Sequence, residues 1–403
     1  MPRYSIRRLH LISEAMMARE IGVKESAKLN AFSRLYHEHP FVLKVIVREG
    51  ELSRGLISAI SLRGFACWVH DQTSCYVFAD EPSLRDWTRV QIFSSSEEEI
   101  FVNELRGFLV RQARTYFEMS SDQYVLQFGG PTRLMGVLNV TPDSFFDGGK
   151  YAEKNSAVER GLALESEGAD IIDIGGESTR PGADPVTEAE ELERVIPVIE
   201  GLSSELQIPI SIDTYKASVA EAAIQAGADI VNDVSAMRMD VHMMEVVAHY
   251  KVPVILMHMK GEPKNMQRNP VYKNLMDELY LFFEDRIEAA KNAGIPEDRI
   301  IIDPGIGFGK RLWDNYEILQ RLTEFKGLGC PVLVGPSRKT FIGKVLNLPP
   351  EERLEGTAAA VAACVAGGSQ IIRVHDVRQM LRVVQIADLI YGKVDLQQQG
   401  NGG

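Results

Sequence analysis

The sequence lacks the features that mark several classes of protein. It contains no run of about 18 apolar residues, so we expect no helix that spans a membrane. The basic N-terminal segment has no continuous apolar stretch and does not resemble a secretory signal. Cysteine is scarce, and the four that occur form no CxxC pair and no metal-ligand spacing: Cys67, Cys75, Cys330 and Cys364. We therefore expect buried thiols in a reducing, cytoplasmic location.

Positive charge is also in short supply. The 403 residues include 44 Lys and Arg against 56 Asp and Glu, a net charge of −12, which disfavours a general nucleic-acid-binding protein. Residues 1–128 hold 16 basic and 16 acidic residues, so the whole excess lies in residues 129–403. An anion that binds the second part therefore needs a local cluster of cations and backbone N–H groups.

Ordinary composition places the chain among globular proteins. Hydrophobic residues make up 45% and charged residues 25%, which excludes a mostly disordered chain, a collagen and a coiled coil. Gly129, Gly130 and Pro131 mark a break in the pattern. Before this break we predict a small α+β accessory domain over residues 1–128, with strands at 41–47 and 75–79 and a helix at 97–117. We find no constellation of catalytic type there.

After the break, apolar strands alternate with amphipathic helices. The near-continuous Ile, Val and Leu runs are typical of strands buried on both faces. The candidate strands are residues 134–139, 169–174, 209–213, 229–234, 252–258, 300–303, 332–335 and 371–375. Helical patterns lie between most of them, at 157–168, 188–204, 217–226, 239–250, 272–293, 313–326 and 356–366. Eight such units predict an α/β protein with a (β/α)8 TIM barrel over residues 129–403. An open doubly wound sheet is the alternative, but no G-x-G-x-x-G follows the first strand.

Polar residues cluster where the predicted strands end. In a barrel the carboxyl ends of the strands carry the active site, and helix capping alone does not explain so many polar positions. The main residues are Asn139, Asp173, Asp213, Asn232, His258, Asp303, Ser337, Lys339, Arg373 and His375. We interpret His258 as a packed or supporting residue, and Met257 and Met259 as pocket wall.

Two glycine-containing loops follow the first two strands. Asn139 begins the first loop, where its amide oxygen can reach a metal or a ligand or simply form a turn. In the second loop, Gly175 and Gly176 allow close approach of backbone N–H groups to a ligand. The hydroxyl of Thr179 and the guanidinium of Arg180 suit a phosphate, although helix capping is the alternative for the hydroxyl.

Three later strand ends carry the groups that can hold a flat heterocycle. The carboxylates of Asp213 and Asp303 can each accept two N–H bonds from an amino-pyrimidinone edge, and Asn232 offers a donor and an acceptor. Acid–base catalysis or Mg²⁺ binding can use the same residues. The segments GPSRK and RVHD, at residues 335–339 and 373–376, supply cations and a histidine for an anionic substrate.

These motifs resemble those of dihydropteroate synthase, an enzyme of folate biosynthesis. The segments occur in the same order: LNVTPDSFFDGG, DIIDIGGESTRPGA, SIDT, NDVSA, LMHM, DPGIGFGK, GPSRKTFIG and RVHDV. The resemblance covers residues 133–394. Phe146 departs from the family, which more often has Ser there, and the family does not usually carry a segment like residues 1–128.

The resemblance implies a reaction and a set of site residues. A pterin-binding barrel would condense (7,8-dihydropterin-6-yl)methyl diphosphate with 4-aminobenzoate to give 7,8-dihydropteroate and diphosphate, by SN1-like loss of diphosphate. The pterin would be held by Asp213, Asn232, Asp303 and Lys339. The diphosphate would be held by Thr179, Arg373 and His375, with Mg²⁺ at Asn139. The 4-aminobenzoate pocket would comprise Phe145, Arg180, Pro181, Phe308 and Ser337, with Asp147 and Asp173 supporting the mobile loops.

The resemblance also leads to expectations about inhibitors and oligomeric state, and it leaves two alternative functions to consider. Sulfonamides should compete with 4-aminobenzoate, and a homodimer is expected, with no nucleic-acid or membrane partner. One alternative is a pterin-binding methyltetrahydrofolate methyltransferase, which needs no diphosphate site. The other is a non-catalytic pterin-binding barrel. The cations near residues 180, 339 and 373 argue against the first, and the complete set of polar positions argues against the second.

Overall fold

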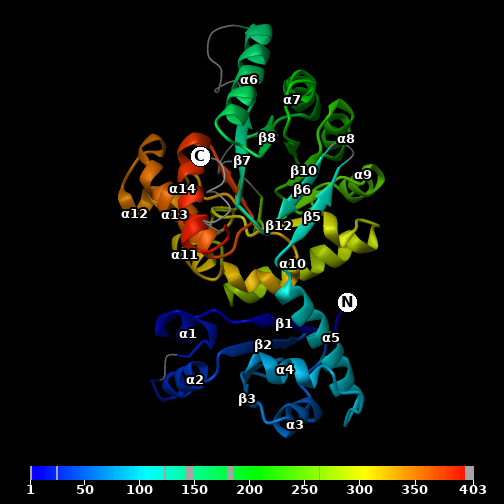
Figure 1. The fold of residues 1–403 in the computed structure, drawn as a ribbon, viewed down its shortest axis with the longest axis vertical. Coiled ribbons are helices and arrows are strands. Elements are labelled where there is room, and N and C mark those ends of the chain that lie inside the picture. Colours follow the sequence, from blue (N-terminus) through cyan, green and yellow to red (C-terminus); the bar gives the residue numbers. More distant parts are fainter. Residues whose placement is uncertain are drawn as a thin grey trace. The chain divides into compact units, whose positions relative to one another are not determined.

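The computed structural model describes residues 2–23, 26–121, 124–140, 149–178, 185–262 and 264–394, without the side chains of 149–153. The chain forms two compact units (Figure 1). The N-terminal unit comprises Met1–Arg114, Lys273–Leu281 and Arg321–Gly329, and the barrel unit comprises the rest. Residues 115–128, which the sequence analysis assigned to the accessory domain, thus belong to the barrel unit.

Eight parallel strands form the barrel, as predicted. They are β7 (Arg133–Asn139), β8 (Ile171–Gly175), β9 (Ile210–Asp213), β10 (Ile230–Asp233), β11 (Val254–Met257), β12 (Ile300–Asp303), β13 (Leu333–Val334) and β14 (Ile371–Val374). The order of pairing is β12-β11-β10-β9-β8-β7-β14-β13. A parallel bridge between Ile302 and Val332 joins the two ends of this order. The sheet therefore closes, and all eight strand ends face one mouth.

Helices follow the strands of the barrel. They are α6 (Gly149–Ser166), α7 (Glu188–Ser203), α8 (Ala217–Ala226), α9 (Met243–Tyr250), α10 (Leu275–Asn292), α11 (Leu312–Gln320), α12 (Thr340–Leu346), α13 (Leu354–Ala366) and α14 (Val377–Ile390), with short 3₁₀ turns η2 (Glu297–Arg299), η3 (Leu322–Leu328) and η4 (Pro350–Glu352). The prediction of one helix over 313–326 is wrong. The α-helix ends at Gln320, and the chain tightens into η3, where Arg321 and Glu324 are buried.

A hairpin replaces part of another predicted helix. Helix α5 (Ser96–Ala113) ends before residue 117, and β5 (Phe117–Ser120) pairs with β6 (Val125–Phe128). Phe117, Met119 and Phe128 pack against residues near the starts of the barrel strands, such as Ile171 and Ile371. The alternation of buried and exposed residues in β5 is that of a strand with one buried face. The hairpin thus closes the barrel at the end opposite the strand carboxyl ends.

The N-terminal unit is an α+β fold, as predicted. Its antiparallel sheet has the order β1-β2-β4-β3 and comprises β1 (Tyr4–Arg8), β2 (Phe41–Val47), β3 (Ala66–Val69) and β4 (Ser74–Ala79). The helices are α1 (Glu14–Glu20), α2 (Ser26–Glu38), α3 (Arg54–Leu62), α4 (Glu81–Trp87) and α5. The predicted strands at 41–47 and 75–79 are confirmed, the second with one more residue at its start.

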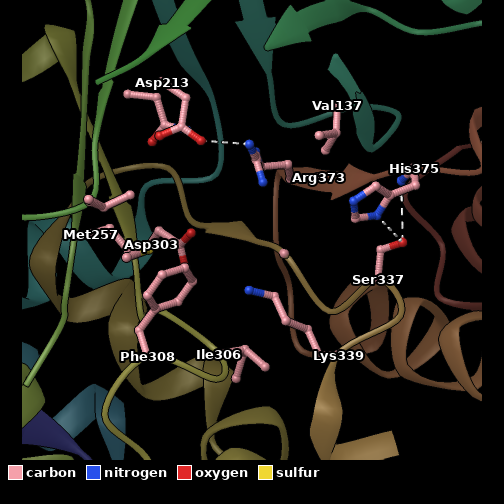
Figure 2. A pocket seen from close by; sticks show the side chains of 13 residues that line it. Val137, Asp213, Met257, Asp303, Ile306, Phe308, Ser337, Lys339, Arg373 and His375 are labelled. Carbon is pink, nitrogen blue, oxygen red and sulfur yellow. Dashed lines mark hydrogen bonds and ion pairs between the residues drawn. The ribbon is translucent and has the colours of Figure 1, made fainter. Parts of the chain in front are cut away.

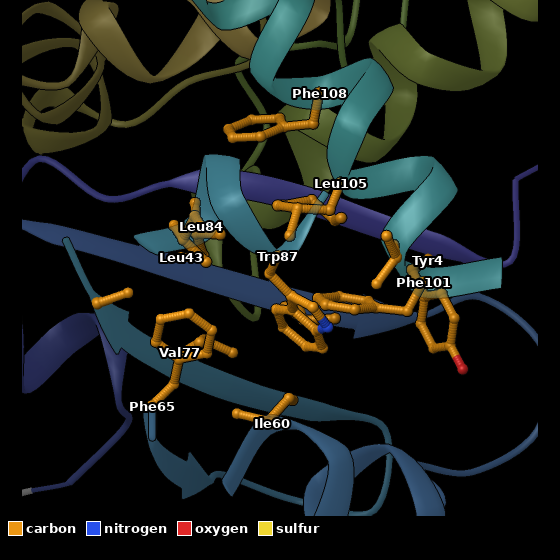
Figure 3. Packing of buried hydrophobic residues seen from close by; sticks show 14 of the residues in the cluster. Tyr4, Leu43, Ile60, Phe65, Val77, Leu84, Trp87, Phe101, Leu105 and Phe108 are labelled. Carbon is orange, nitrogen blue, oxygen red and sulfur yellow. The ribbon is translucent and has the colours of Figure 1, made fainter. Parts of the chain in front are cut away.

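Each face of this sheet packs against an apolar core. Leu43 and Val77 face a core that includes Trp87 and Phe101 (Figure 3). The alternate residues of β2 and β4 face a second core around Phe32. Because successive side chains in a strand point to opposite faces, the sheet is the middle layer of the unit.

Six charged side chains, five of them buried, form one cluster in the N-terminal unit. This buried charge cluster comprises Arg7, Glu20, Lys44, Asp277, Arg321 and Glu324, three cations and three carboxylates. Glu20 accepts bonds from Lys44 at 2.8 Å, Arg321 at 2.7 Å and Arg7 at 3.2 Å. Arg7 also pairs with Glu324, and Asp277 pairs with Lys44 at 2.6 Å. Residues from late in the chain therefore complete the interior of the N-terminal unit.

Candidate active site

A pocket opens at the carboxyl ends of the barrel strands (Figure 2). Its polar lining brings together the predicted residues Asp213, Asn232, Asp303, Ser337, Lys339, Arg373 and His375, with Phe308 beside them. Apolar walls are supplied by Val137, Val234, Met257 and Ile306, of which the sequence analysis named only Met257. The sequence pattern thus located the polar residues, while the apolar walls resemble any other core positions.

The two aspartates are buried at the ends of β9 and β12. Burial raises the pKa of Asp213 to about 7 and that of Asp303 to about 6, although nearby cations act in the opposite direction. Asp303 accepts a backbone hydrogen bond from Gly305 at 2.7 Å. Within the described residues, Oδ1 of Asp213 has no hydrogen-bond partner. The pocket thus offers a buried acceptor that a bound molecule with N–H groups can satisfy.

Arg373 links two carboxylates across the mouth. Its Nε donates to Asp173 at 2.5 Å and its Nη2 donates to Asp213 at 2.8 Å. Asn232 donates to the same oxygen of Asp173 at 3.1 Å. Burial alone would lower the pKa of Arg373, but the two carboxylates hold it above its usual value, so the guanidinium is charged. Asp173, predicted to support a loop, is therefore the partner that orients Asn232 and Arg373.

Lys339 and Phe308 form a second side of the pocket. Nζ of Lys339 lies 4.2 Å from the centroid of the Phe308 ring, a cation–π contact, and Figure 2 shows both side chains near Asp303. Ser337 is buried, and its hydroxyl lies 3.0 Å from Nδ1 of His375. A cation, an aromatic face and a serine–histidine pair therefore meet in one small volume.

The loop after β12 is held tightly by a lysine that sequence reasoning missed. Lys310 is buried and donates to the carbonyl oxygens of His258 and Phe308, both at 3.1 Å, and it lies 2.9 Å from Nδ1 of His258. Burial lowers the pKa of Lys310 to about 7. Gly305 has a φ of 67°, and a Cβ there would lie 2.1 Å from the His258 carbonyl oxygen. His258 is therefore a packed residue, as predicted, and its partner is the lysine that ends DPGIGFGK.

Glu177, a second residue that the sequence analysis did not name, forms hydrogen bonds after strand β8. Glu177 accepts hydrogen bonds from Lys216 at 2.6 Å, from the Tyr215 hydroxyl at 3.1 Å and from the Val186 backbone at 3.3 Å. In the sequence, residues 179–184 follow Glu177 and precede Val186. The signal was present in the sequence, because Glu177 is the acidic residue of GGESTR.

Five predicted site residues lie outside the described residues: Phe145, Asp147, Thr179, Arg180 and Pro181. Asn139 is described and ends β7. Its Oδ1 and Oδ2 of Asp213 lie 3.9 Å and 3.7 Å from the position that a Cβ on Gly175 would take. Gly175 thus leaves room for both oxygens at the same mouth.

Two other kinds of site are absent from the described residues. In the part of the chain that the structure describes, no group of three His, Cys, Asp or Glu side chains is arranged to hold a metal ion. Among the same residues, no helix is both long and apolar enough to span a membrane.

Comparisons with known proteins identify the barrel. The family model described as pterin binding enzyme matches residues 135–375. A dihydropteroate synthase from Synechocystis is 48% identical over 270 residues, which cover 67% of this chain and 93% of that protein.

Solved structures agree with this result. The Yersinia pestis dihydropteroate synthase, solved with a sulfonamide drug, matches with a TM-score of 0.65 and 42% identity, covering 68% of this chain and all of that one. The Xanthomonas albilineans dihydropteroate synthase, solved with 4-aminobenzoic acid, has the same TM-score, 44% identity and coverages of 68% and 98%. With the pocket residues assembled at the barrel mouth and matches that cover almost the whole of these relatives, the chain belongs to the dihydropteroate synthases, the pterin-binding transferases of folate synthesis.

Proposed function

We propose that the barrel condenses (7,8-dihydropterin-6-yl)methyl diphosphate with 4-aminobenzoate, giving 7,8-dihydropteroate and diphosphate. The observation that carries this proposal is the meeting of two buried carboxylates, an amide and two cations at one barrel mouth. The Xanthomonas relative binds 4-aminobenzoic acid, which supports the second substrate.

In this proposal the pterin lies against Asp213, Asn232 and Asp303, with Lys339 beside it. Oδ1 of Asp213 is buried and has no partner among the residues that the structure describes, and a 2-amino-pyrimidinone edge presents parallel N–H donors that could satisfy it. Burial of both carboxylates excludes water, so each hydrogen bond is worth more than it is at a surface. Arg373 orients the Asp213 carboxylate by donating a hydrogen bond to its Oδ2.

The reaction then proceeds by loss of the leaving group. The C–O bond to diphosphate breaks with its electron pair on oxygen, and the electron-rich dihydropterin stabilises the methylene cation. The 4-aminobenzoate nitrogen bonds to that carbon and then loses a proton. The negative charge of Asp213 or Asp303 would favour the developing cation, and a dry pocket strengthens this effect.

The diphosphate would be held by Thr179, Arg373 and His375. A guanidinium has five N–H donors, so Arg373 can keep both of its carboxylates and still donate to a diphosphate oxygen. Mg²⁺ prefers oxygen ligands and keeps several as water or phosphate, so Asn139 Oδ1, at the end of β7, fits as its protein ligand. When bound, the ion would supply positive charge that offsets the charge of the departing diphosphate.

The 4-aminobenzoate pocket would comprise Phe145, Arg180, Pro181, Phe308 and Ser337. The cation–π contact of Lys339 with Phe308 supports an aromatic wall at that point. We propose that sulfonamides compete for this pocket, as the sulfonamide complex of the Yersinia enzyme suggests.

We also propose a homodimer in the cytoplasm. The small residues of α13 permit close helix packing, and α14 exposes large apolar side chains at Ile386 and Ile390. The four free cysteines suit a reducing compartment. Light scattering on the purified chain measures the oligomeric state directly.

The test of the reaction is an assay of diphosphate release and dihydropteroate formation by the full chain. Lys339→Ala should lower kcat/KM about ten- to a hundredfold, because a hydrogen bond to a charged group is worth about 1.5–3 kcal/mol. Lys154→Ala, a change of the same kind outside the pocket lining, is the control. A methyltransferase would release no diphosphate, and an unchanged Lys339→Ala enzyme would remove that lysine from the site.

A further inference from the structure

We propose that the N-terminal unit binds a small phosphate-bearing metabolite in a cavity of its own. The cavity has a volume of about 340 Å³, within the range of small-ligand pockets. All its lining residues belong to the N-terminal unit, and six polar ones carry the argument: Arg8, His10, Tyr36, Gln112, Thr323 and Lys326. None of them lines the barrel mouth, so the proposal does not depend on the proposed reaction.

The first argument is uncompensated positive charge. Among the described residues, neither Arg8 nor Lys326 has a carboxylate partner, and Arg8 stacks on the ring of Phe41 at 4.2 Å. The cations of the buried charge cluster, in contrast, are all paired. The one acidic residue in the lining, Glu81, is already paired with Arg85 at 2.6 Å. In a chain of net charge −12, two unpaired cations at one cavity favour an anionic ligand.

The second argument is unused hydrogen-bonding capacity. The side-chain oxygens of Gln112 and Thr323 are buried and, within the described part of the chain, lack a hydrogen-bond partner. Buried polar groups in native proteins are normally satisfied, so each such group calls for an explanation. The Tyr36 hydroxyl is fixed, because it accepts a bond from the Leu11 backbone at 2.8 Å. The wall therefore combines cations with an amide and hydroxyls.

This combination selects phosphate among common anions. Arg and Lys are the residues that most often bind phosphate, and the Thr323 hydroxyl can donate to one of its remaining oxygens. The Gln112 side-chain oxygen can only accept, so it suits an O–H or N–H group on the organic part of the ligand. Leu9, Pro40 and Ala113 add an apolar part to the wall, which suits an organic phosphate rather than the bare ion. The ligand class is thus a phosphate monoester no larger than a mononucleotide.

The experiment titrates the full-length protein with adenosine 5′-monophosphate in a calorimeter, with adenosine as the uncharged comparison. The variant Arg8→Gln with Lys326→Gln removes both cations of the cavity. Its matched control is Arg34→Gln with Arg89→Gln, which removes the same charge from two side chains of the same unit that are 74% and 78% exposed. Arg373→Ala reports any binding of the probe at the barrel mouth.

The proposal expects binding of the monophosphate but not of adenosine. The cavity variant should weaken that binding at least about tenfold, while the exposed control and Arg373→Ala leave it unchanged. If circular dichroism shows that the double variant is unfolded, Lys326→Gln alone should still weaken binding. Wild-type affinity in a folded cavity variant, no binding by the wild type, or loss of binding only in Arg373→Ala would overturn the proposal.

Discussion

The buried charge cluster gives the sharpest test of how the N-terminal unit is stabilised. Glu20 is 2% exposed and bonds with Arg7, Lys44 and Arg321. Burial alone would raise the pKa of Glu20, but the three cations hold it well below its usual value. Glu20→Gln keeps the shape of the side chain and leaves three buried cations facing two carboxylates.

The expected cost follows from burial. Removing one partner of a buried ion pair typically costs about 3–5 kcal/mol, and the remaining amide oxygen, which can still accept from Lys44, places this change near the lower end. At an m-value of about 1–3 kcal/mol per molar urea, the midpoint should fall by roughly 1–3 M. Glu38→Gln is the matched control, because Glu38 pairs with Arg34 on the surface, where such pairs contribute about 0–1 kcal/mol.

Tryptophan fluorescence can follow this unit separately. Trp68 and Trp87 lie in the N-terminal unit, and Trp87 is 2% exposed, whereas Trp313 of the barrel unit is 72% exposed. Urea unfolding monitored by fluorescence should therefore report mainly on the N-terminal unit. A Glu20→Gln midpoint that matches the Glu38→Gln midpoint would refute the reasoning.

The pH dependence supplies a second check on the same variant. Because the folded pKa of Glu20 lies below its unfolded value, its contribution is complete above the unfolded pKa and is lost as the pH falls through the folded one. The stability difference between wild type and Glu20→Gln should thus be complete at neutral pH, begin to shrink as the pH falls below the unfolded pKa of Glu20, and be lost below the folded one.

Three further predictions concern the barrel. Arg373→Ala should lower kcat/KM by about ten- to a hundredfold relative to Lys154→Ala, and a smaller loss in steady-state assays would contradict its role. Burial raises the pKa of Asp213 to about 7 and that of Asp303 to about 6. If the pterin binds to the ionised carboxylates, kcat/KM should rise with pH between about 5 and 8. A flat pH profile would mean that these charges are not needed. Finally, 4-aminobenzoate should bind weakly to the free protein and more tightly when Mg²⁺ and diphosphate are present. Binding of Mg²⁺ and diphosphate would already restrict the active-site residues near both ligands, so 4-aminobenzoate binding would lose less conformational entropy. Equal affinity in the two calorimetric titrations would show that the pocket is preformed.

The barrel could be predicted from the sequence because its signals are local. Each strand is a short apolar run followed by a polar residue, and both features can be found without knowing any contact. The partners of those polar residues could not be predicted in the same way. Asp173 and Arg373 are 200 positions apart, and only the closed sheet, which pairs β14 with β7 and β7 with β8, brings their side chains to 2.5 Å.

The errors in the prediction have the same physical origin. The pattern of residues 313–326 suits one helix, but burial of Arg321 and Glu324 in a distant cluster ends that helix at Gln320. Likewise, the helix predicted to reach residue 117 ends at Ala113, and Phe117 instead begins β5 of the hairpin and packs against the barrel strands. In both places tertiary contacts override local propensity, which contributes less than about 1 kcal/mol per residue.

The buried charge cluster combines residues of the N-terminal segment with residues from the part of the chain that the family model matches. The family model matches residues 135–375, so Asp277, Arg321 and Glu324 all lie within the family's part of the chain. Their partners Arg7, Glu20 and Lys44, however, lie before residue 114, and all of the six side chains except Asp277 are buried. A chain that begins at residue 115 would leave two carboxylates and one arginine without these partners. Since unpaired buried charges are costly, the N-terminal segment forms part of one cooperative interior, and variants of the barrel are best compared in the full-length chain.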